Sequence, residues 1–147
     1  MRYFEDFRQG ETIELGEYEV TEREVLAFGR MYDPQPFHVD PEAARRSPFG
    51  GLIASGWHTT AMFMRLWVDG LLSDTASMGS PGVEQIRWLV PVRPGDVLRG
   101  RVKVAEAAPS QTRPDRGTLI TESELVNQRD EVVMTMRGRG FVARRDA

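Results

Sequence analysis

Residues 56–72 read GWHTTAMFMRLWVDGLL, and apolar side chains fall almost all the way round this stretch when it is wound as a helix. A helix that is apolar on most sides has to be covered by other parts of the chain. We therefore predict a long central helix from about Gly56 to about Leu72, wrapped by the remaining structure.

The C-terminal half supplies material for that cover. Leu98, Val102 and Val104 alternate with basic residues, as expected for a strand with one face in water. Turn signals such as Pro94-Gly95-Asp96 separate the apolar runs. We predict four strands joined as an antiparallel meander, at residues 83–90, 97–104, 118–126 and 132–142.

The N-terminal part carries an extended segment, 11–20, followed by the start of a helix. Thr21 and Glu24 fit a capping box, in which the Thr21 hydroxyl accepts from the backbone of residue 24 and Glu24 reaches back. This helix should end near Tyr32, because the sequence Asp-Pro-Gln-Pro follows it.

A second, short helix should begin after Asp40, which can cap it, with Pro41 at its first position. Helices therefore come first and strands afterwards, and no repeat or long linker divides the chain. This order predicts a single α+β domain over residues 1–147, a curved antiparallel sheet packed on one long helix.

Composition excludes several classes of site. The 147 residues include no cysteine, which removes disulfides, thiol nucleophiles and thiolate zinc sites. The only two histidines are His38 and His58, so one chain cannot build a catalytic metal site from three histidines. We expect no bound metal.

The net charge and the N-terminal sequence indicate which partners and which cellular location to expect. The net charge of −3 gives no general attraction to nucleic acid or to an anionic membrane. The first residues, MRYFEDFRQGE, contain acids and arginines where a signal peptide needs apolar residues. We expect a cytoplasmic protein that binds neither nucleic acid nor membrane.

The segment from Asp33 to His38 could carry acid–base chemistry. Two prolines fix the backbone between these residues, so an irregular but rigid loop could aim a carboxylate and an imidazole at one water. The same pattern also fits a structural interpretation, in which Asp33 caps the helix end and His38 is a hydrogen-bonded core residue.

Small residues lead into the long helix. Gly56 falls where the free N–H groups and the positive end of the helix dipole point outward, which suits a carbonyl oxygen that gains negative charge. Glycine there would let a ligand approach closely. Alternatively, the glycines allow tight packing and Ser55 is an N-cap. His58 is a second catalytic candidate or, alternatively, a structural residue of the helix.

Three motifs together resemble a known family. Residues 33–44, DPQPFHVDPEAA, resemble the signature Asp-x-Asn-Pro-Leu/Ile/Phe-His-x-Asp-x-x-x-Ala of the MaoC-like dehydratases, the (R)-specific enoyl-CoA hydratases of the hot-dog fold. Residues 53–56 are similar to the family's second motif, and residues 90–96 to its later Pro-Gly-Asp turn. The order of motifs matches over about residues 4–142.

The resemblance implies a single hot-dog domain with Asp33 and His38 as the catalytic dyad. It also implies that the Gly56 N–H holds a thioester carbonyl, with further substrate-binding residues at Ser55, Gln35 and Trp57. The expected reaction is reversible addition of water to a trans-2-enoyl thioester, giving the (R)-3-hydroxyacyl thioester. No cofactor is expected, since CoA or pantetheine enters as part of the substrate.

Two departures from the family pattern concern the acid. Gln35 stands where the signature usually has asparagine. Some hydratases of this family steady the aspartate with a serine one to two turns into the central helix, and Met64 occupies that position here. Thr59 or Thr60 could replace this serine.

The resemblance also implies a homodimer with two sheets joined edge to edge, or a dimer of dimers or larger assembly. Two other functions stay open: a hot-dog acyl-CoA thioesterase, and a non-catalytic subunit that binds acyl thioesters. Bulky rings at Trp57, Phe63 and Trp67 predict a preference for short acyl groups, unless these rings face the sheet.

Overall fold

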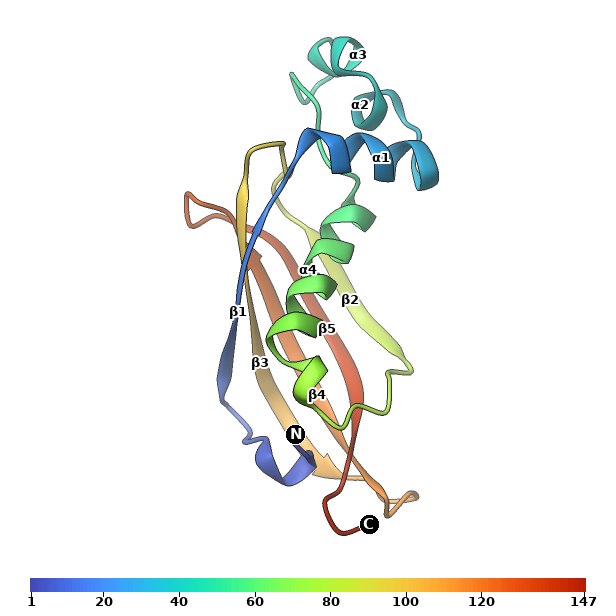
Figure 1. The fold of residues 1–147 in the computed structure, drawn as a ribbon, viewed down its shortest axis with the longest axis vertical. Helices are drawn as coiled ribbons and strands as arrows, with labels where there is room; N and C mark the ends of the chain where they lie inside the picture. The colour runs from blue at the N-terminus through green and yellow to red at the C-terminus, as the bar shows by residue number, and fades with distance from the viewer.

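The computed structural model describes Met1–Ala147 and shows one long helix, α4 (Gly56–Gly70), lying along a five-stranded antiparallel sheet (Figure 1). The strand order is β1-β3-β4-β5-β2. This is the predicted α+β hot-dog architecture. Its strands are β1 (Thr12–Glu19), β2 (Gly82–Trp88), β3 (Val97–Pro109), β4 (Arg116–Val126) and β5 (Val132–Ala143).

The predicted meander is correct for β3, β4 and β5 but wrong for β2. Strand β2 pairs with β5 at one edge of the sheet, and β1 takes the place beside β3. The segment between β2 and β3 carries the chain past the start of α4, where the Val92 carbonyl accepts from the Ala54 N–H at 2.8 Å. Its prolines favour this crossing over a tight hairpin, because a proline cannot donate to a strand ladder.

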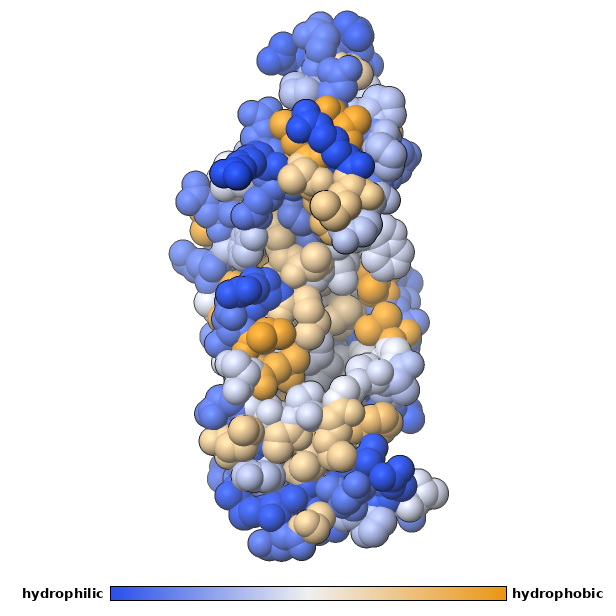
Figure 2. Space-filling view, turned by 45° about the vertical axis from the view of Figure 1, so that its right-hand side comes forward, coloured by the Kyte–Doolittle hydropathy of each residue, from blue (hydrophilic) through white to orange (hydrophobic).

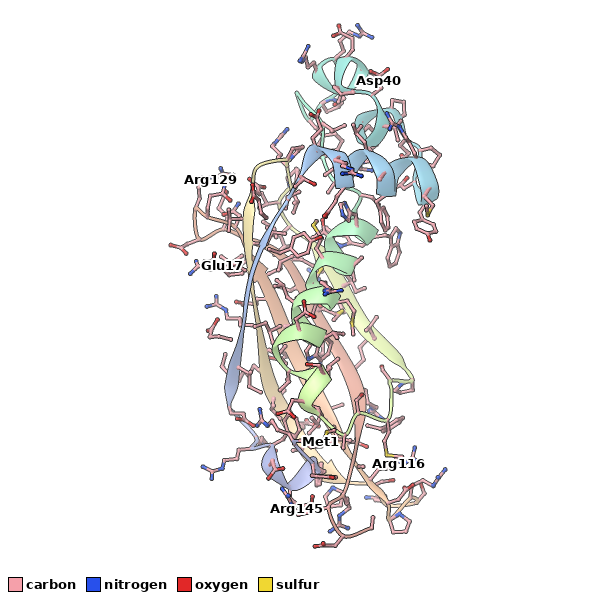
Figure 3. The ribbon with its side chains drawn as sticks, viewed as in Figure 1. Met1, Glu17, Asp40, Arg116, Arg129 and Arg145 are labelled. Atoms are coloured by element: carbon pink, nitrogen blue, oxygen red, sulfur yellow. The ribbon has the colours of Figure 1, made fainter.

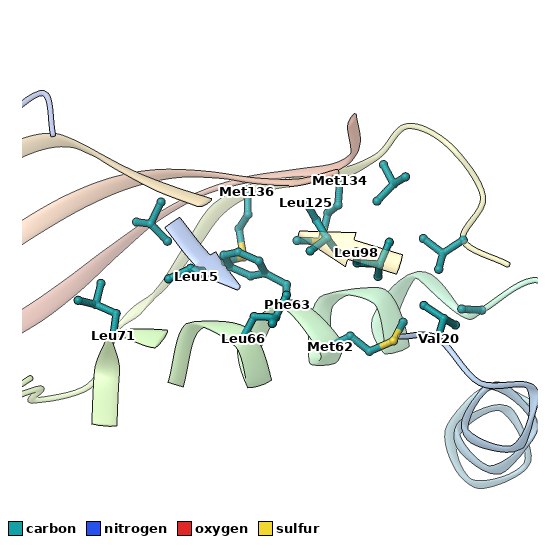
Figure 4. Close-up of a cluster of buried hydrophobic side chains, with 14 of the residues drawn as sticks. Leu15, Val20, Met62, Phe63, Leu66, Leu71, Leu98, Leu125, Met134 and Met136 are labelled. Carbon is teal, nitrogen blue, oxygen red and sulfur yellow. The ribbon is translucent and has the colours of Figure 1, made fainter. Parts of the chain in front are cut away.

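The core lies between α4 and the sheet (Figure 4). Met62, Phe63 and Leu66 are buried on the sheet side of the helix, and Leu98 and Met134 on the strands facing it are fully buried. The alternation along β3 is as predicted, with basic side chains on the outer face. Burial of such apolar surface is the main favourable term in folding.

The sheet covers α4 from one side only. Met64 and Val68 are exposed on the other side of the helix. The helix is 15 residues long, and no helix of the structure is both long and apolar enough to cross a membrane.

Three helices lie at one end of the sheet: α1 (Glu22–Tyr32), α2 (Pro36–Val39) and α3 (Pro41–Arg45) (Figure 1). Thr21 caps α1 as predicted, accepting from the Glu24 N–H at 3.2 Å. The Glu24 carboxylate instead accepts from the Tyr18 hydroxyl at 2.5 Å, which ties α1 to β1.

The segment after α1 is more regular than predicted. Residues Pro36–Val39 form one turn of helix, in which the Asp40 N–H donates to the Pro36 carbonyl at 2.9 Å. Proline at the first helical position, with φ preset, favours this turn. Asp40 then caps α3 as predicted, accepting from the N–H groups of Glu42 and Ala43.

The two chain termini lie at the other end of the molecule, near two short 3-10 helices, η1 (Phe4–Asp6) and η2 (Leu72–Asp74). Figure 3 shows Arg145 at this end and Asp40 at the opposite one. Arg145 pairs there with Asp6, so the last residues are tied to the first. The candidate residues Asp33 and His38 lie at the opposite, helical end, at the C-cap of α1 and in α2.

Candidate active site

The end of α1, the single turn α2 and the start of α4 meet at one point. Asp33 is the C-cap of α1, His38 lies in α2, and Ser55 is the N-cap of α4. The Ile53 N–H donates to the Phe37 carbonyl at 3.1 Å, which joins the strip before α4 to α2. Backbone bonds therefore position residues that are far apart in the sequence.

Asp33 and His38 form a close pair. His38 Nε2 lies 3.3 Å from Asp33 Oδ2, and His38 is only 4% exposed. His38 Nδ1 lies 2.8 Å from the Ile53 carbonyl oxygen. A carbonyl only accepts, so Nδ1 carries the hydrogen and Nε2 is the nitrogen left facing the carboxylate.

Two further side chains hold the Asp33 carboxylate. The Gln35 amide donates to Oδ1 at 2.8 Å, and the Ser55 hydroxyl donates to Oδ2 at 2.7 Å. Burial alone would raise the pKa of Asp33, but the hydrogen bonds from Gln35 and Ser55, together with the neighbouring His38, outweigh it and lower the pKa from its ordinary value. Asp33 is thus kept as a carboxylate, the form that accepts a proton.

Ser55 is the residue whose role sequence reasoning missed. It is an N-cap, as one interpretation held, because its Oγ accepts from the Trp57 N–H at 3.3 Å. It also bonds the acid 22 residues away, which no local signal indicates. Thr59 and Thr60 donate back to carbonyls of their own helix, and Met64 is exposed. Ser55, at the start of α4, therefore donates to Asp33 in place of the serine that was expected one to two turns into the helix.

Gly56 is the first residue of α4, and its N–H has no partner in the structure. The N–H lies at the positive end of the helix dipole, beside the dyad. A Cβ built on Gly56 would lie 2.4 Å from Cδ2 of Trp88, so the Trp88 ring fills the space that a side chain would need. The packing of the Trp88 ring therefore requires glycine here.

A cavity of about 400 Å³ opens at this junction. His38 and Gly56 line it together with Trp88, and most of its other lining residues are apolar. Such a cavity, mostly apolar with a few convergent polar groups, is typical of a small-molecule site. Trp57, the remaining predicted binding residue, is 59% exposed and lies against Trp88 rather than against the dyad.

His58 lies away from the dyad. Its ring stacks on Phe28 of α1 with 4.9 Å between centroids, and its Nδ1 is buried without a partner. Burial lowers the pKa of His58, which favours the neutral ring. No group of three or more acidic or histidine side chains is close enough to hold a metal ion.

We predict that His58 is dispensable for catalysis. His58→Gln keeps the dyad intact, so kcat/KM should stay within about tenfold of wild type, a barrier change below about 1.4 kcal/mol. Steady-state hydration kinetics measure this. A loss in kcat/KM as large as that caused by His38→Ala would show that the catalytic histidine is His58 and not His38.

Comparison with known proteins agrees with the geometry. The family model described as a MaoC like domain matches residues 6–125. The crystal structure of the MaoC-like dehydratase from Rhodospirillum rubrum superposes with a TM-score of 0.91, at 41% identity over 100% of both chains.

Two relatives are similar in sequence. The 3-hydroxybutyryl-CoA dehydratase of Methylorubrum extorquens is 32% identical over 118 residues, which are 76% of this chain and 69% of that protein. The uncharacterized protein YdeM of Bacillus subtilis is 30% identical over 127 residues, 86% of this chain and 88% of that one. With a family model over most of its length, this chain belongs to the MaoC-like dehydratase family.

Proposed function

We propose that the protein is a hydratase that adds water reversibly to a trans-2-enoyl-CoA thioester to give the (R)-3-hydroxyacyl thioester. The observation that carries this proposal is the 3.3 Å contact between Asp33 and His38, together with the cavity that His38 shares with Gly56, whose N–H is unpartnered. A base, a water-holding nitrogen and a donor for a carbonyl oxygen are the groups that this addition needs.

The thioester carbonyl accepts a hydrogen bond from the Gly56 N–H. Conjugation then makes C3 electrophilic, and the negative charge that develops on the oxygen during attack is stabilised by the N–H and by the positive end of α4. The apolar walls of the cavity strengthen this interaction, because the local dielectric is low.

A water between the dyad and C3 supplies both new groups. It donates one hydrogen to Asp33 and the other to the free Nε2 of His38, which aims its oxygen at C3. As the C3–O bond forms, the water loses a proton to the dyad and the C2–C3 double bond shifts its electron pair toward the carbonyl. The dyad returns this proton to C2 on the same face, so water is added without loss or gain of electrons.

This chemistry uses proton transfer and hydrogen bonding only. The reaction needs no metal or resident cofactor, and the CoA moiety belongs to the substrate. The name of the Methylorubrum extorquens relative makes a four-carbon acyl-CoA the first substrate to test.

One assay separates the hydratase from its alternatives. Crotonyl-CoA is incubated with the protein, and both the enoyl absorbance and free thiol are followed. We expect loss of absorbance without free CoA. Release of CoA would instead identify a thioesterase, and binding of crotonyl-CoA without either change would identify a non-catalytic subunit.

Ser55→Ala tests whether the hydroxyl tunes the acid. The hydroxyl favours the Asp33 carboxylate, so its removal raises the pKa of Asp33 and moves the acidic limb of the kcat/KM profile to higher pH. At neutral pH we expect kcat/KM to fall about ten- to a hundredfold, the value of one hydrogen bond to a charged group. Ser55→Thr, which keeps the hydroxyl, is the control. A lower rate with an unmoved limb would mean that Ser55 only caps α4.

We also propose a homodimer joined through β2. This edge strand is exposed along most of its length, and the apolar side chains of Val83 and, just beyond the strand, Leu89 are in contact with solvent. An exposed apolar edge offers unpaired backbone groups to a second chain. Sedimentation equilibrium measures the mass, and a monomer at high concentration would contradict the proposal.

A further inference from the structure

Trp88, the last residue of β2, lies over the start of α4. The ring is so close to Gly56 that a Cβ built there would be 2.4–2.7 Å from three of its atoms. Its Nε1 donates to the Thr60 hydroxyl at 3.1 Å, one turn further along the helix. The ring also contacts that of Trp57, edge-on at 5.1 Å between ring centroids.

Two cavities lie on either side of these contacts, because Trp88 lines one of them and its partners Thr60 and Trp57 line the other. The first, of about 400 Å³, holds His38 and Gly56 and has Trp88 in its wall. The second, of about 490 Å³, is a mainly apolar groove between α4 and strands β2 and β5, and it begins at Trp57 and Thr60. Figure 2 shows apolar side chains gathered around a hollow in the middle of the molecule. The groove continues the line of the helix away from the dyad.

We propose that Trp88 is a specificity residue that closes the passage between the catalytic cavity and the groove. This inference rests on the proposed hydratase function and names its substrate class. An acyl group whose carbonyl is held at Gly56 starts beside the indole. A short chain fits the first cavity, whereas a long chain has to enter the groove between Trp88 and Thr60.

The contacts of Trp88 explain how a single side chain can do this. The indole packs on Gly56 and is held further by one hydrogen bond and one edge-on ring contact, and it is 44% exposed at the end of its strand. The hydrogen bond to Thr60 spans the gap between strand and helix at the mouth of the groove. Removing the ring, or the hydroxyl that holds it, should therefore join the two cavities.

The rings chosen from the sequence lie elsewhere. Phe63 is fully buried in the core, and Trp67 packs against it at 5.5 Å further along the helix. Both line the groove, beyond the position of Trp88. They can limit the depth of the groove, whereas Trp88 lies in the wall of the cavity that also holds His38.

The test compares specificity constants for trans-2-enoyl-CoAs of four, eight and twelve carbons. We expect wild type to prefer the four-carbon substrate, and Trp88→Ala to raise the twelve-to-four ratio of kcat/KM at least about tenfold. Thr60→Val, which removes the acceptor of the indole, should raise the ratio above that of Thr60→Ser, which retains a hydroxyl. Val68→Ala, an exposed position outside both cavities, is the control.

Circular dichroism and thermal melting establish which variants are folded. If Trp88→Ala does not fold, the comparison of Thr60→Val with Thr60→Ser decides whether the passage is closed. A wild type that prefers the twelve-carbon substrate, or folded variants that keep the wild-type ratio, would overturn the assignment.

Failure of the proposed function is separable from failure of this inference. A wild-type protein that hydrates no enoyl-CoA refutes the proposed function. Whether Trp88 closes the passage is then tested by calorimetric binding of S-butyl-CoA and S-dodecyl-CoA thioethers. A rise in the relative affinity for the dodecyl compound in Trp88→Ala supports the closed passage. Equal affinity ratios, or no binding of either compound, overturn it.

Discussion

Asp33→Asn should lower kcat/KM for enoyl-CoA hydration by about a hundred- to ten-thousand-fold, the usual value of a general base. Asparagine keeps the size of the side chain and an oxygen for the Ser55 hydroxyl, which bonds Asp33 at 2.7 Å. An amide cannot take a proton from water, so the chemistry is lost while the geometry stays. His38→Ala should cost a similar factor, because the water then loses the nitrogen that orients it.

Asp40→Asn is the matched control for the acid. Asp40 belongs to the same sequence motif, but its carboxylate caps α3 by accepting from Glu42 and Ala43. Asparagine caps helices as well as aspartate does, so this variant should keep wild-type activity and stability. Circular dichroism verifies each fold. Near wild-type activity in folded Asp33→Asn or His38→Ala would remove the dyad from the mechanism.

Local sequence signals were sufficient for much of the fold. The Thr21 and Asp40 caps, the long helix from Gly56 and the one-sided wetting of β3 all follow from side chains that act within a few residues. A cap or an alternating pattern has the same meaning in any surroundings, which is why these predictions were correct.

Features that depend on partners far along the chain could not be predicted in this way. Pairing of β2 with β5 instead of β3 is set by how the chain passes the start of α4. The bond from Ser55 to Asp33 joins residues 22 apart, and the Trp88 ring reaches Gly56 from a strand on the sheet edge. The resemblance to a family indicated which residues share the site, but not which hydrogen bonds and contacts these residues make.

Gly29→Ala has two opposed effects on stability, one from helix propensity and one from packing. Alanine is the better helix former by about 1 kcal/mol, so propensity alone predicts a more stable protein. Gly29 is buried in α1 where that helix crosses α2, and a Cβ built on it would lie 2.8 Å from the His38 carbonyl oxygen and 3.1 Å from His38 Cβ. Because one of these atoms belongs to the backbone, the two helices have to move apart.

We expect the packing effect to prevail, with a net loss of about 1–3 kcal/mol in the free energy of unfolding, as for other overpacked sites. The loss in activity should be larger than stability alone explains. Asp33 follows Gly29 by one turn, so a shift of α1 away from α2 lengthens the contact between Asp33 Oδ2 and His38 Nε2, now 3.3 Å. Displacements of this kind cost catalysts about a hundredfold in rate.

Ala27→Gly is the reciprocal change at an exposed position of the same helix. This variant should lose about 1 kcal/mol of stability, because glycine is a poorer helix former than alanine. It should keep its activity, because the side chain of Ala27 points to solvent and does not set the distance between α1 and α2. Urea unfolding and hydration kinetics on both variants separate the two effects. A Gly29→Ala protein that is more stable than wild type and fully active would show that α1 and α2 are free to separate, and that the dyad is not held by the close contact of these two helices.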